Sequence, residues 1–285
     1  MHGFFKCGLV LTCTNDVYCQ ICGGIFMVTS TSNQKVKHLV ALSQKAKVRR
    51  EEDSFIVEGP RMFKEAPREQ IKEVYVSESF LKKNADKNLL NDIKYEIVSD
   101  EVFQKISDTK TPQGILSVLK QPHYEITDML KSESPLLIIL EDIQDPGNLG
   151  TILRAGEGAG IDGVIMTKGT ADLFNPKVIR STMGSVYRVP FLYVDNILSA
   201  IEQLKNNGVN VYAAHLEDSV DYDEPDYKTG TAFLIGNEGN GLKRETADAA
   251  TRYIKIPMKG QVESLNAAVA STILMYEAAR QRKLK

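Results

Sequence analysis

Cysteine and long apolar runs are both scarce in this chain of 285 residues. All four cysteines lie in the first 22 residues, so disulfides cannot hold the rest of the chain together, and we expect a cytoplasmic protein. The longest apolar runs, such as residues 135–140, have the length of a strand, whereas a bilayer-crossing helix needs roughly 18 residues. A membrane role is therefore not expected.

An excess of basic residues is also missing. The formal net charge is -2 at pH 7, whereas binding to phosphates usually leaves a basic surplus. The charges are unevenly distributed, because residues 34–50 carry no acid and residues 217–226 are strongly acidic. The basic residues of the first segment are Lys35, Lys37, Lys45, Lys47, Arg49 and Arg50. By charge alone, this segment fits either a solvated helix face or an RNA-contacting surface.

The first 26 residues differ from the rest of the chain. Cys19 and Cys22 have the spacing of half a zinc site, but no second pair with convincing ligand spacing follows, so no metal is expected. This stretch has neither a clear amphipathic period nor a convincing signal-peptide cleavage site. We expect residues 1–26 to be a disordered extension or a segment absent from the native protein, with Met27 as the natural start.

Two α/β regions follow. Residues 27–120 alternate helical segments with strand-like ones, and residues 121–134 have the composition of a linker with a short helix. Residues 135–285 repeat strand, loop and helix, with expected strands at 136–141, 163–166, 189–194, 209–214, 231–235 and 253–256 and a last helix at 265–280. Continuous apolar strands between amphipathic helices predict a mainly parallel sheet, and ligands of such sheets bind at the carboxyl ends of the strands.

Three loops at such strand ends are rich in Gly, Asn and small polar residues. They are residues 145–154 (DPGNLGTILR), 236–242 (GNEGNGL) and 257–266 (PMKGQVESLN). Residues 158–163 also fit the pattern G-x-G-x-x-G of dinucleotide-binding proteins. These glycines, however, end a helix and lead into a strand, which is the wrong order for a Rossmann fingerprint.

Together, in this order and before a terminal helix, the three loops closely resemble motifs 1, 2 and 3 of the SpoU (TrmH-type) family of SPOUT methyltransferases, over about residues 136–280. The resemblance implies transfer of a methyl group from S-adenosylmethionine to a ribose 2′-hydroxyl of RNA. It also implies a C-terminal trefoil knot, a rare exception to the usual topology rules. The cofactor is then expected on Gly236, Ile256 and Leu265, largely through main-chain groups.

The resemblance gives the catalytic role to Arg154. A guanidinium is a poor base, so we expect Arg154 to hold the target phosphate and to stabilise a developing alkoxide. Asn148 is expected to orient Arg154 or the ribose, and Glu238 to hold Asn148 or Arg154. Ser264 is an obvious N-cap for the last helix, whereas Asn266 is expected to contact substrate or cofactor. Both positions belong to the active site of the family.

The first region resembles the L30e-like RNA substrate-binding domain that precedes many SpoU catalytic domains, which favours ribosomal RNA over tRNA. Residues 43–50, 55–59 and 109–114 carry this looser resemblance. The residues expected to contact RNA are Lys45, Lys47, Arg49 and Arg50 there, and Lys177 and Arg180 in the second region.

Alternative functions remain open from the sequence. The chain fits an inactive RNA-binding or ribosome-assembly protein on the same fold, a tRNA ribose methyltransferase, or a base methyltransferase. The segment Glu263-Ser-Leu-Asn266 favours ribose over base. Because family members pair through the knot region, a homodimer in which both protomers shape each site is expected.

Overall fold

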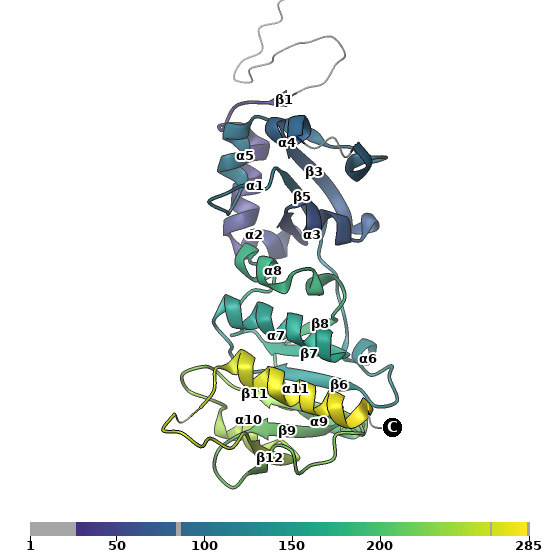
Figure 1. Cartoon of the computed structure of the whole chain (residues 1–285), viewed down its shortest axis with the longest axis vertical. Coiled ribbons are helices and arrows are strands. Elements are labelled where there is room, and N and C mark those ends of the chain that lie inside the picture. Colours follow the sequence, from purple (N-terminus) through teal and green to yellow (C-terminus); the bar gives the residue numbers. More distant parts are fainter. Residues whose placement is uncertain (1–26, 84–86, 263, 284–285) are drawn as a thin grey trace, which may run out of the picture.

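The computed structural model describes residues 27–83, 87–262 and 264–283. The expected extension 1–26, with its four cysteines, lies outside the described residues. A small domain and a larger domain lie end to end, and the molecule is elongated (Figure 1). The chain thus has the two α/β regions that its sequence predicts.

The small domain is built on a five-stranded mixed sheet with the order β1-β4-β3-β5-β2. Strands β1 and β3 run parallel to β4, and β5 runs antiparallel to β2 and β3. The strands are β1 (Met27–Val28), β2 (Ser54–Glu58), β3 (Ile71–Ser77), β4 (Glu96–Val98) and β5 (Ile115–Lys120). The helices are α1 (Gln34–Gln44), α2 (Ala46–Glu51), α3 (Pro60–Glu65), α4 (Glu78–Lys83) and α5 (Asp100–Ile106), with two short 3₁₀ turns, Arg68–Gln70 and Lys87–Leu90.

The larger domain is built on a seven-stranded sheet with the order β10-β12-β9-β11-β6-β7-β8, in which every neighbouring pair is parallel. The strands are β6 (Leu136–Leu140), β7 (Gly163–Thr167), β8 (Phe191–Val194), β9 (Asn210–Ala214), β10 (Val220–Asp221), β11 (Thr231–Ile235) and β12 (Arg252–Lys255). The helices are α6 (Ile126–Met129), α7 (Pro146–Ala159), α8 (Pro176–Thr182), α9 (Ile197–Asn206), α10 (Arg244–Asp248) and α11 (Ala267–Lys283), with a 3₁₀ turn at Ser185–Tyr187. The predicted parallel sheet is confirmed.

Both faces of this sheet are buried, which explains the continuous apolar strands. Alternate residues of β6 point to opposite faces, and all five are at most 1% exposed. Leu136, Ile138 and Leu140 join the core under α7 and α11, whereas Leu137 and Ile139 join the core under α6 and α9. Two helical layers therefore fix the position of every strand end at the edge that carries the three loops.

Helices α7 and α11 begin at other residues than the sequence predicts. The apolar pattern predicts a helix over residues 151–158, but helix α7 starts five residues earlier, at Pro146, because the Asp145 carboxylate accepts the backbone amide of Asn148 and caps the helix. Helix α11 starts at Ala267 and packs along α7 after the loop that follows β12. The trefoil knot, which depends on how that loop passes the rest of the chain, stays a prediction.

The two domains share a packed joint. Phe55 of β2 lies against Phe174, with ring centroids 4.6 Å apart, and both belong to the core that continues under α7. Arg49 of α2 crosses the joint and pairs with Asp172, at 2.5 Å from Nη2 to Oδ2. The segment expected as a linker, residues 121–134, forms α6, whose Ile126 and Met129 are buried against the large sheet. The domains are thus joined by side-chain packing as well as by the chain.

The described part of the chain contains no helix that is long and apolar enough to span a membrane.

Candidate active site

A cavity of about 460 Å³ opens at the carboxyl ends of β9, β11 and β12. Its size lies within the range of small-molecule sites. The walls are formed by the ends of the three strands, by residues 236–242, by Ile256, Met258, Ser264 and Leu265, and by the first turns of α11. The residues that line it include Gly236, Ile256 and Leu265, the three predicted cofactor contacts, together with Glu238 and Ser264. Arg154, Asn148 and Asn266 are not among the lining residues.

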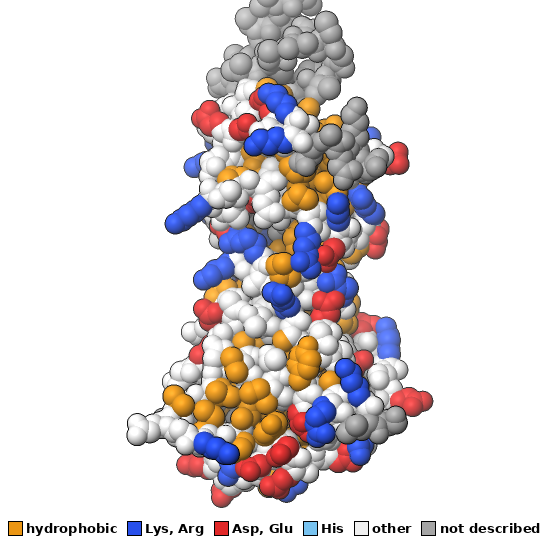
Figure 2. Space-filling model, in the orientation of Figure 1, with side chains coloured by type: hydrophobic (Ala, Val, Ile, Leu, Met, Phe, Trp, Pro, Cys, Tyr) orange, Lys and Arg blue, Asp and Glu red, His pale blue; other side chains and the backbone are white. Residues whose placement is uncertain are grey.

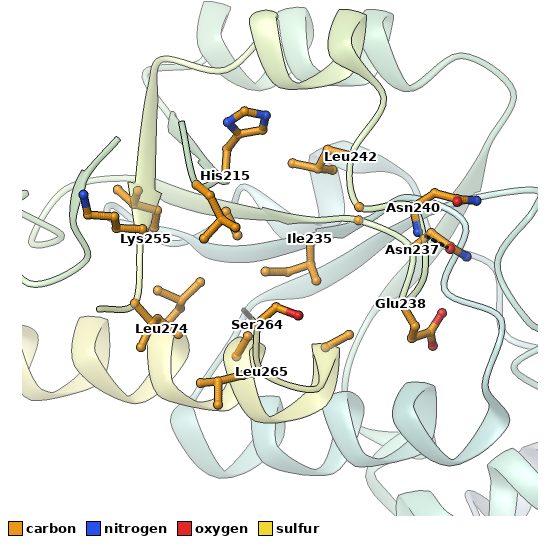
Figure 3. A pocket seen from close by; sticks show the side chains of 18 of the residues that line it. His215, Ile235, Asn237, Glu238, Asn240, Leu242, Lys255, Ser264, Leu265 and Leu274 are labelled. Atoms are coloured by element: carbon orange, nitrogen blue, oxygen red, sulfur yellow. Dashed lines mark hydrogen bonds between the residues drawn. The ribbon is translucent and has the colours of Figure 1, made fainter. Parts of the chain in front are cut away.

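The cavity is mostly apolar near the sheet. Figure 3 shows Ile235 at its centre, Leu265 and Leu274 on the side of α11, and Leu242 on the opposite side. Glu238 points away from this apolar region toward the ribbon of α7 (Figure 3). The site thus offers apolar walls beside the exposed main chain of a glycine-rich loop, which suits a ligand with a flat apolar part and polar edges.

The loop after β11 is folded tightly on itself. Asn237 and Gly241 exchange backbone hydrogen bonds, at 3.0 and 2.9 Å between nitrogen and oxygen. The Asn237 side-chain oxygen also accepts the amides of Gly239 and Asn240. A Cβ on Gly236 would lie 2.2 Å from the carbonyl carbon of Gly241. Glycine is therefore required at position 236 by the loop itself, before any ligand is considered.

Three predicted catalytic side chains form one hydrogen-bonded row. The Asn266 amide group donates to the Asn148 side-chain oxygen at 2.9 Å, and the Asn148 amide group donates to Glu238 Oε1 at 2.9 Å. The row links α11, α7 and the loop after β11. Of the two partners expected for Glu238, Asn148 is the one it binds.

Glu238 also accepts the backbone amides of Gln144 and Asp145, each at 3.2 Å, just before α7. Burial alone would raise the pKa of Glu238, but the hydrogen bonds from Asn148 and from these backbone amides outweigh it and hold the pKa below its ordinary value. The carboxylate is therefore ionised at neutral pH and sits at the amino end of α7, where a negative charge is favourable.

The cap of α11 is Asn266, and the prediction that Ser264 caps this helix is wrong. The Asn266 side-chain oxygen accepts the amides of Ala268 and Val269, at 2.9 and 3.3 Å. The helix starts two residues later than predicted, so Ser264 lies before it, on the cavity wall. Asn266 thus has a structural role through its oxygen and joins the row through its amide group. Glu263 lies outside the described residues.

Arg154 lies on the exposed face of α7 and, within the described residues, has no hydrogen bond or ion pair. It lies six positions after Asn148, which corresponds to about 9 Å along a helix axis. The neighbouring turn of this face, at Gly158, lies against Tyr276 of α11, where an added Cβ would be 2.8 Å from the hydroxyl oxygen. The guanidinium is therefore free for an external partner beside the α7–α11 surface.

The residues predicted to bind RNA divide into two groups. Lys45, Lys47, Arg50 and Lys177 are exposed. Arg49 is 2% exposed and donates to the carbonyls of Leu42 and Ser43 as well as to Asp172, so its assignment as an RNA contact is wrong in this structure. Arg180 is half-buried and pairs with Asp108 across the joint at 2.8 Å.

Several cavity residues carry no recognisable signal in the sequence. Ala270 and Leu274 line it as ordinary apolar residues of α11, and His215 and Glu217 follow β9, for which the sequence predicts only the strand end at this edge. Leu242 and Met258 lie within the motif loops, but no role is predicted for either side chain. Within the described residues there is no group of three or more side chains suited to hold a metal ion.

The chain matches two family models, the SpoU rRNA Methylase family over residues 135–276 and the MRM3-like substrate binding domain over residues 33–117. It is 34% identical to the "23S rRNA (guanosine(2553)-2'-O)-methyltransferase RlmP" of Bacillus subtilis over 251 residues, which cover 87% of this chain and 97% of the relative. An "Uncharacterized tRNA/rRNA methyltransferase" of Synechocystis is 31% identical, over 90% of this chain and 95% of the relative.

The fold matches solved structures as well. The AdoMet-bound rRNA methyltransferase from Sinorhizobium meliloti superposes with a TM-score of 0.79 at 34% identity, covering 90% of this chain and 98% of that chain. The motifs at the sheet edge, the two-domain order and these relatives agree: the chain belongs to the SpoU family of RNA methyltransferases.

Proposed function

We propose that this protein transfers a methyl group from S-adenosylmethionine to a ribose 2′-hydroxyl of RNA, with ribosomal RNA as the substrate. The observation that carries the proposal is the row Asn266–Asn148–Glu238 beside a cavity lined by Gly236, Ile256 and Leu265. It joins the three motifs of the family at one place. The rRNA methyltransferases among the relatives support the choice of substrate.

The cavity fits S-adenosylmethionine. Ile235, Leu265 and Leu274 give apolar walls for an adenine ring, and the main chain around Gly236 and Ile256 offers polar groups for its edge. The AdoMet-bound relative supports this assignment. When bound, the cofactor supplies an electrophilic methyl group, and the remaining tasks fall to side chains of this protein.

Arg154 is the residue to which we assign the central task. Its guanidinium stays protonated at physiological pH, so it can bind a phosphate of the RNA and stabilise negative charge on the attacking ribose oxygen. It has no partner among the described residues that would have to be released first. Ser264 lines the cavity from the side of α11 and is assigned a contact with substrate or cofactor.

Glu238 and Asn148 act as positioning groups in this proposal. Both oxygens of Glu238 already accept hydrogen bonds, from Asn148, Gln144 and Asp145, and its pKa is lowered, so the carboxylate is a poor base. Its task is to hold α7 against the loop after β11. Asn148, which is bound on both sides, fixes the start of the helix that carries Arg154.

RNA binding is assigned to the small domain and to α8. The exposed lysines and arginine at positions 45, 47, 50 and 177 would contact phosphates, whereas sequence reading requires unpaired bases. Arg180 can contribute only if RNA competes with Asp108. The match of residues 33–117 to a substrate-binding domain supports this assignment.

A homodimer through the α7–α11 surface completes the proposal. Val269 and Tyr276 of α11 are 47% and 49% exposed, which is high for large apolar side chains, and Val262 before the helix is 64% exposed. Figure 2 shows apolar side chains gathered on the face of the large domain that carries α11 in Figure 1. A second copy on this surface would bring Arg154 into contact with both protomers, so sedimentation at micromolar concentration should show a dimer.

Titration calorimetry with S-adenosylmethionine, followed by transfer of a tritiated methyl group to unmodified ribosomal RNA, tests the proposal. We expect binding, transfer to ribosomal RNA but not to tRNA, and a labelled position that resists alkaline hydrolysis, because the 2′-oxygen is blocked. Transfer to tRNA alone would establish the alternative substrate, and label absent from ribose would establish a base methyltransferase. Absence of cofactor binding would favour the inactive RNA-binding protein. Cytoplasmic location belongs to the same proposal, because ribosomal RNA is the substrate.

A further inference from the structure

Two residues at the end of β6, Glu141 and Asp142, meet both ends of the loop that lines the cavity. Glu141 is 1% exposed, and its carboxylate accepts the Lys243 backbone amide at 2.8 Å and the Thr246 hydroxyl at 2.6 Å. A buried carboxylate with two donors holds them firmly, because leaving either one unpaired is costly. Glu141 therefore fixes the point where the loop ends and α10 begins.

Asp142 holds both ends of the same loop. Its backbone oxygen accepts the Asn237 side-chain amide at 2.8 Å, next to the start of the loop, and its carboxylate accepts Lys243 Nζ at 3.0 Å, at the end. The other carboxylate oxygen accepts the Thr167 hydroxyl at 2.7 Å. The Thr167 hydroxyl and Lys243 hold the pKa of Asp142 below its ordinary value, so the group is charged at neutral pH.

The loop between these two attachments contains the glycines Gly239 and Gly241 and lines the cavity. Glycines have few conformational restrictions, so a free loop would lose much entropy when it closes on a ligand. Attachment at Asn237 and Lys243 removes that loss before the ligand arrives. Neither Glu141 nor Asp142 lines the cavity, so both act only through the loop.

We infer that Glu141, Asp142 and Lys243 are positioning residues that preorganise residues 237–242 for the cofactor. The inference rests on the proposed function, because it assumes S-adenosylmethionine in this cavity. Loss of an attachment should raise the dissociation constant and the KM for the cofactor. It should leave unchanged the KM for RNA, because the RNA surface is untouched. Any fall in kcat at saturating cofactor should be smaller than the loss of cofactor affinity, because Glu238 of the same loop keeps its own hydrogen bonds to Asn148 and to the backbone amides of Gln144 and Asp145.

Lys243→Met removes the attachment to Asp142, and Lys131→Met is the matched control. Lys131 also forms an ion pair, at 2.8 Å with Asp128 of α6, but this pair does not involve the loop that lines the cavity. Calorimetry of the full chain should give about three- to tenfold weaker binding of S-adenosylmethionine for Lys243→Met, as expected for an exposed or partly exposed pair, and unchanged binding for Lys131→Met. Equal binding by both variants would overturn the inference.

Hydrogen exchange of the ligand-free protein separates loop order from cofactor binding. Amides of residues 237–242 should exchange faster in Lys243→Met than in the wild type, and at the wild-type rate in Lys131→Met. Unchanged exchange in Lys243→Met would overturn the inference even if the enzyme is active. Wild-type protein that binds no S-adenosylmethionine would instead remove the proposed function, and the cofactor role of the loop with it.

Glu141 tests the same idea with a conservative replacement. Glu141→Gln keeps an oxygen for the Lys243 amide and a polar group for Thr246, so cofactor affinity should stay within about threefold of wild type. Glu141→Leu leaves both donors unpaired and should lose at least about tenfold, with its melting temperature recorded beside it. Equal affinity of the glutamine and leucine variants would contradict the positioning role.

Discussion

Charged side chains are used differently at the joint between the domains and at the edge that carries the cavity. At the joint, arginines have carboxylate partners: Arg49 binds Asp172, Arg180 binds Asp108, and Arg188 binds Glu65 and Glu157. At the edge, Arg154 has no partner among the described residues, and Glu238 is held by neutral donors. Paired arginines hold the domains together, whereas the unpaired one is available to substrate.

The largest effect expected from this difference is on catalysis at Arg154. Arg154→Ala should lower kcat about 100- to 1000-fold, the usual result of removing one group that stabilises a transition-state charge. Cofactor affinity and the free energy of unfolding should stay near wild type, since the side chain is exposed and binds nothing in the described chain. Single-turnover methyl transfer with saturating RNA, beside calorimetry and chemical denaturation, measures all three. A kcat within tenfold of wild type would remove Arg154 from the mechanism.

Arg49 should give the opposite pattern. Arg49→Met takes away a buried guanidinium with four hydrogen bonds and leaves Asp172 without its cation, which should lower the free energy of unfolding by about 3 kcal/mol. RNA affinity should keep its wild-type salt dependence, because the side chain does not reach the surface. Urea denaturation and filter binding at several salt concentrations test the pair of statements. A stable variant with a reduced salt slope would return Arg49 to the RNA surface.

These two arginines also indicate what a sequence can predict. Apolar strands buried on both faces leave a pattern that does not depend on distant partners, so the parallel sheet and its loop-bearing edge could be predicted. The charge of a residue does not show in the same way whether its side chain is paired or exposed. Arg49 and Arg50 are neighbours in one basic run, yet one is buried against Asp172 and the other is exposed, because only the packing of the second domain decides which is paired.

Site residues that belong to a sequence motif could be predicted, whereas apolar residues that only form part of the cavity wall could not. The second and third loops contain Gly236 and Leu265, and Ile256 lies just before the third loop, whereas Ala270 and Leu274 line the cavity as ordinary apolar residues of α11. The role of Asn266 was half predicted, because capping of α11 depends on where the helix starts. The attachment of the loop to Glu141 depends on the pairing of β6 with β11, which brings together segments that are far apart in the sequence.

Acid titration compares a carboxylate at the joint, Glu157, with a carboxylate at the cavity edge, Glu238. Hydrogen bonding to Arg188 lowers the pKa of Glu157, and neutral donors lower that of Glu238 in spite of burial. A lowered folded-state pKa means that the stabilisation is present above the ordinary value of 4.5 and is lost as the pH falls through the folded-state pKa.

The difference in unfolding free energy between wild type and Glu157→Gln, and likewise Glu238→Gln, should therefore shrink between about pH 6 and about pH 3. Added salt should reduce the difference at pH 6 for Glu157, whose partner is charged, more than for Glu238. A difference that grows on acidification would show that the sign is wrong. An equal response to salt at both positions would mean that Glu238 also depends on a cation.

The smallest effects are expected from single basic residues of the RNA surface. Replacement of Lys45, Lys177 or Arg50 by alanine should weaken RNA binding a few-fold and reduce the slope of log K against log salt by about 0.7 to 0.9 for each phosphate that the variant no longer neutralises. Lys37→Ala, an exposed lysine that was not assigned to RNA, is the matched control. If all of these variants leave the slope unchanged, RNA does not bind to the surface formed by α2 and α8. In that case, exposed basic side chains without a partner are not enough to identify the surface that binds RNA.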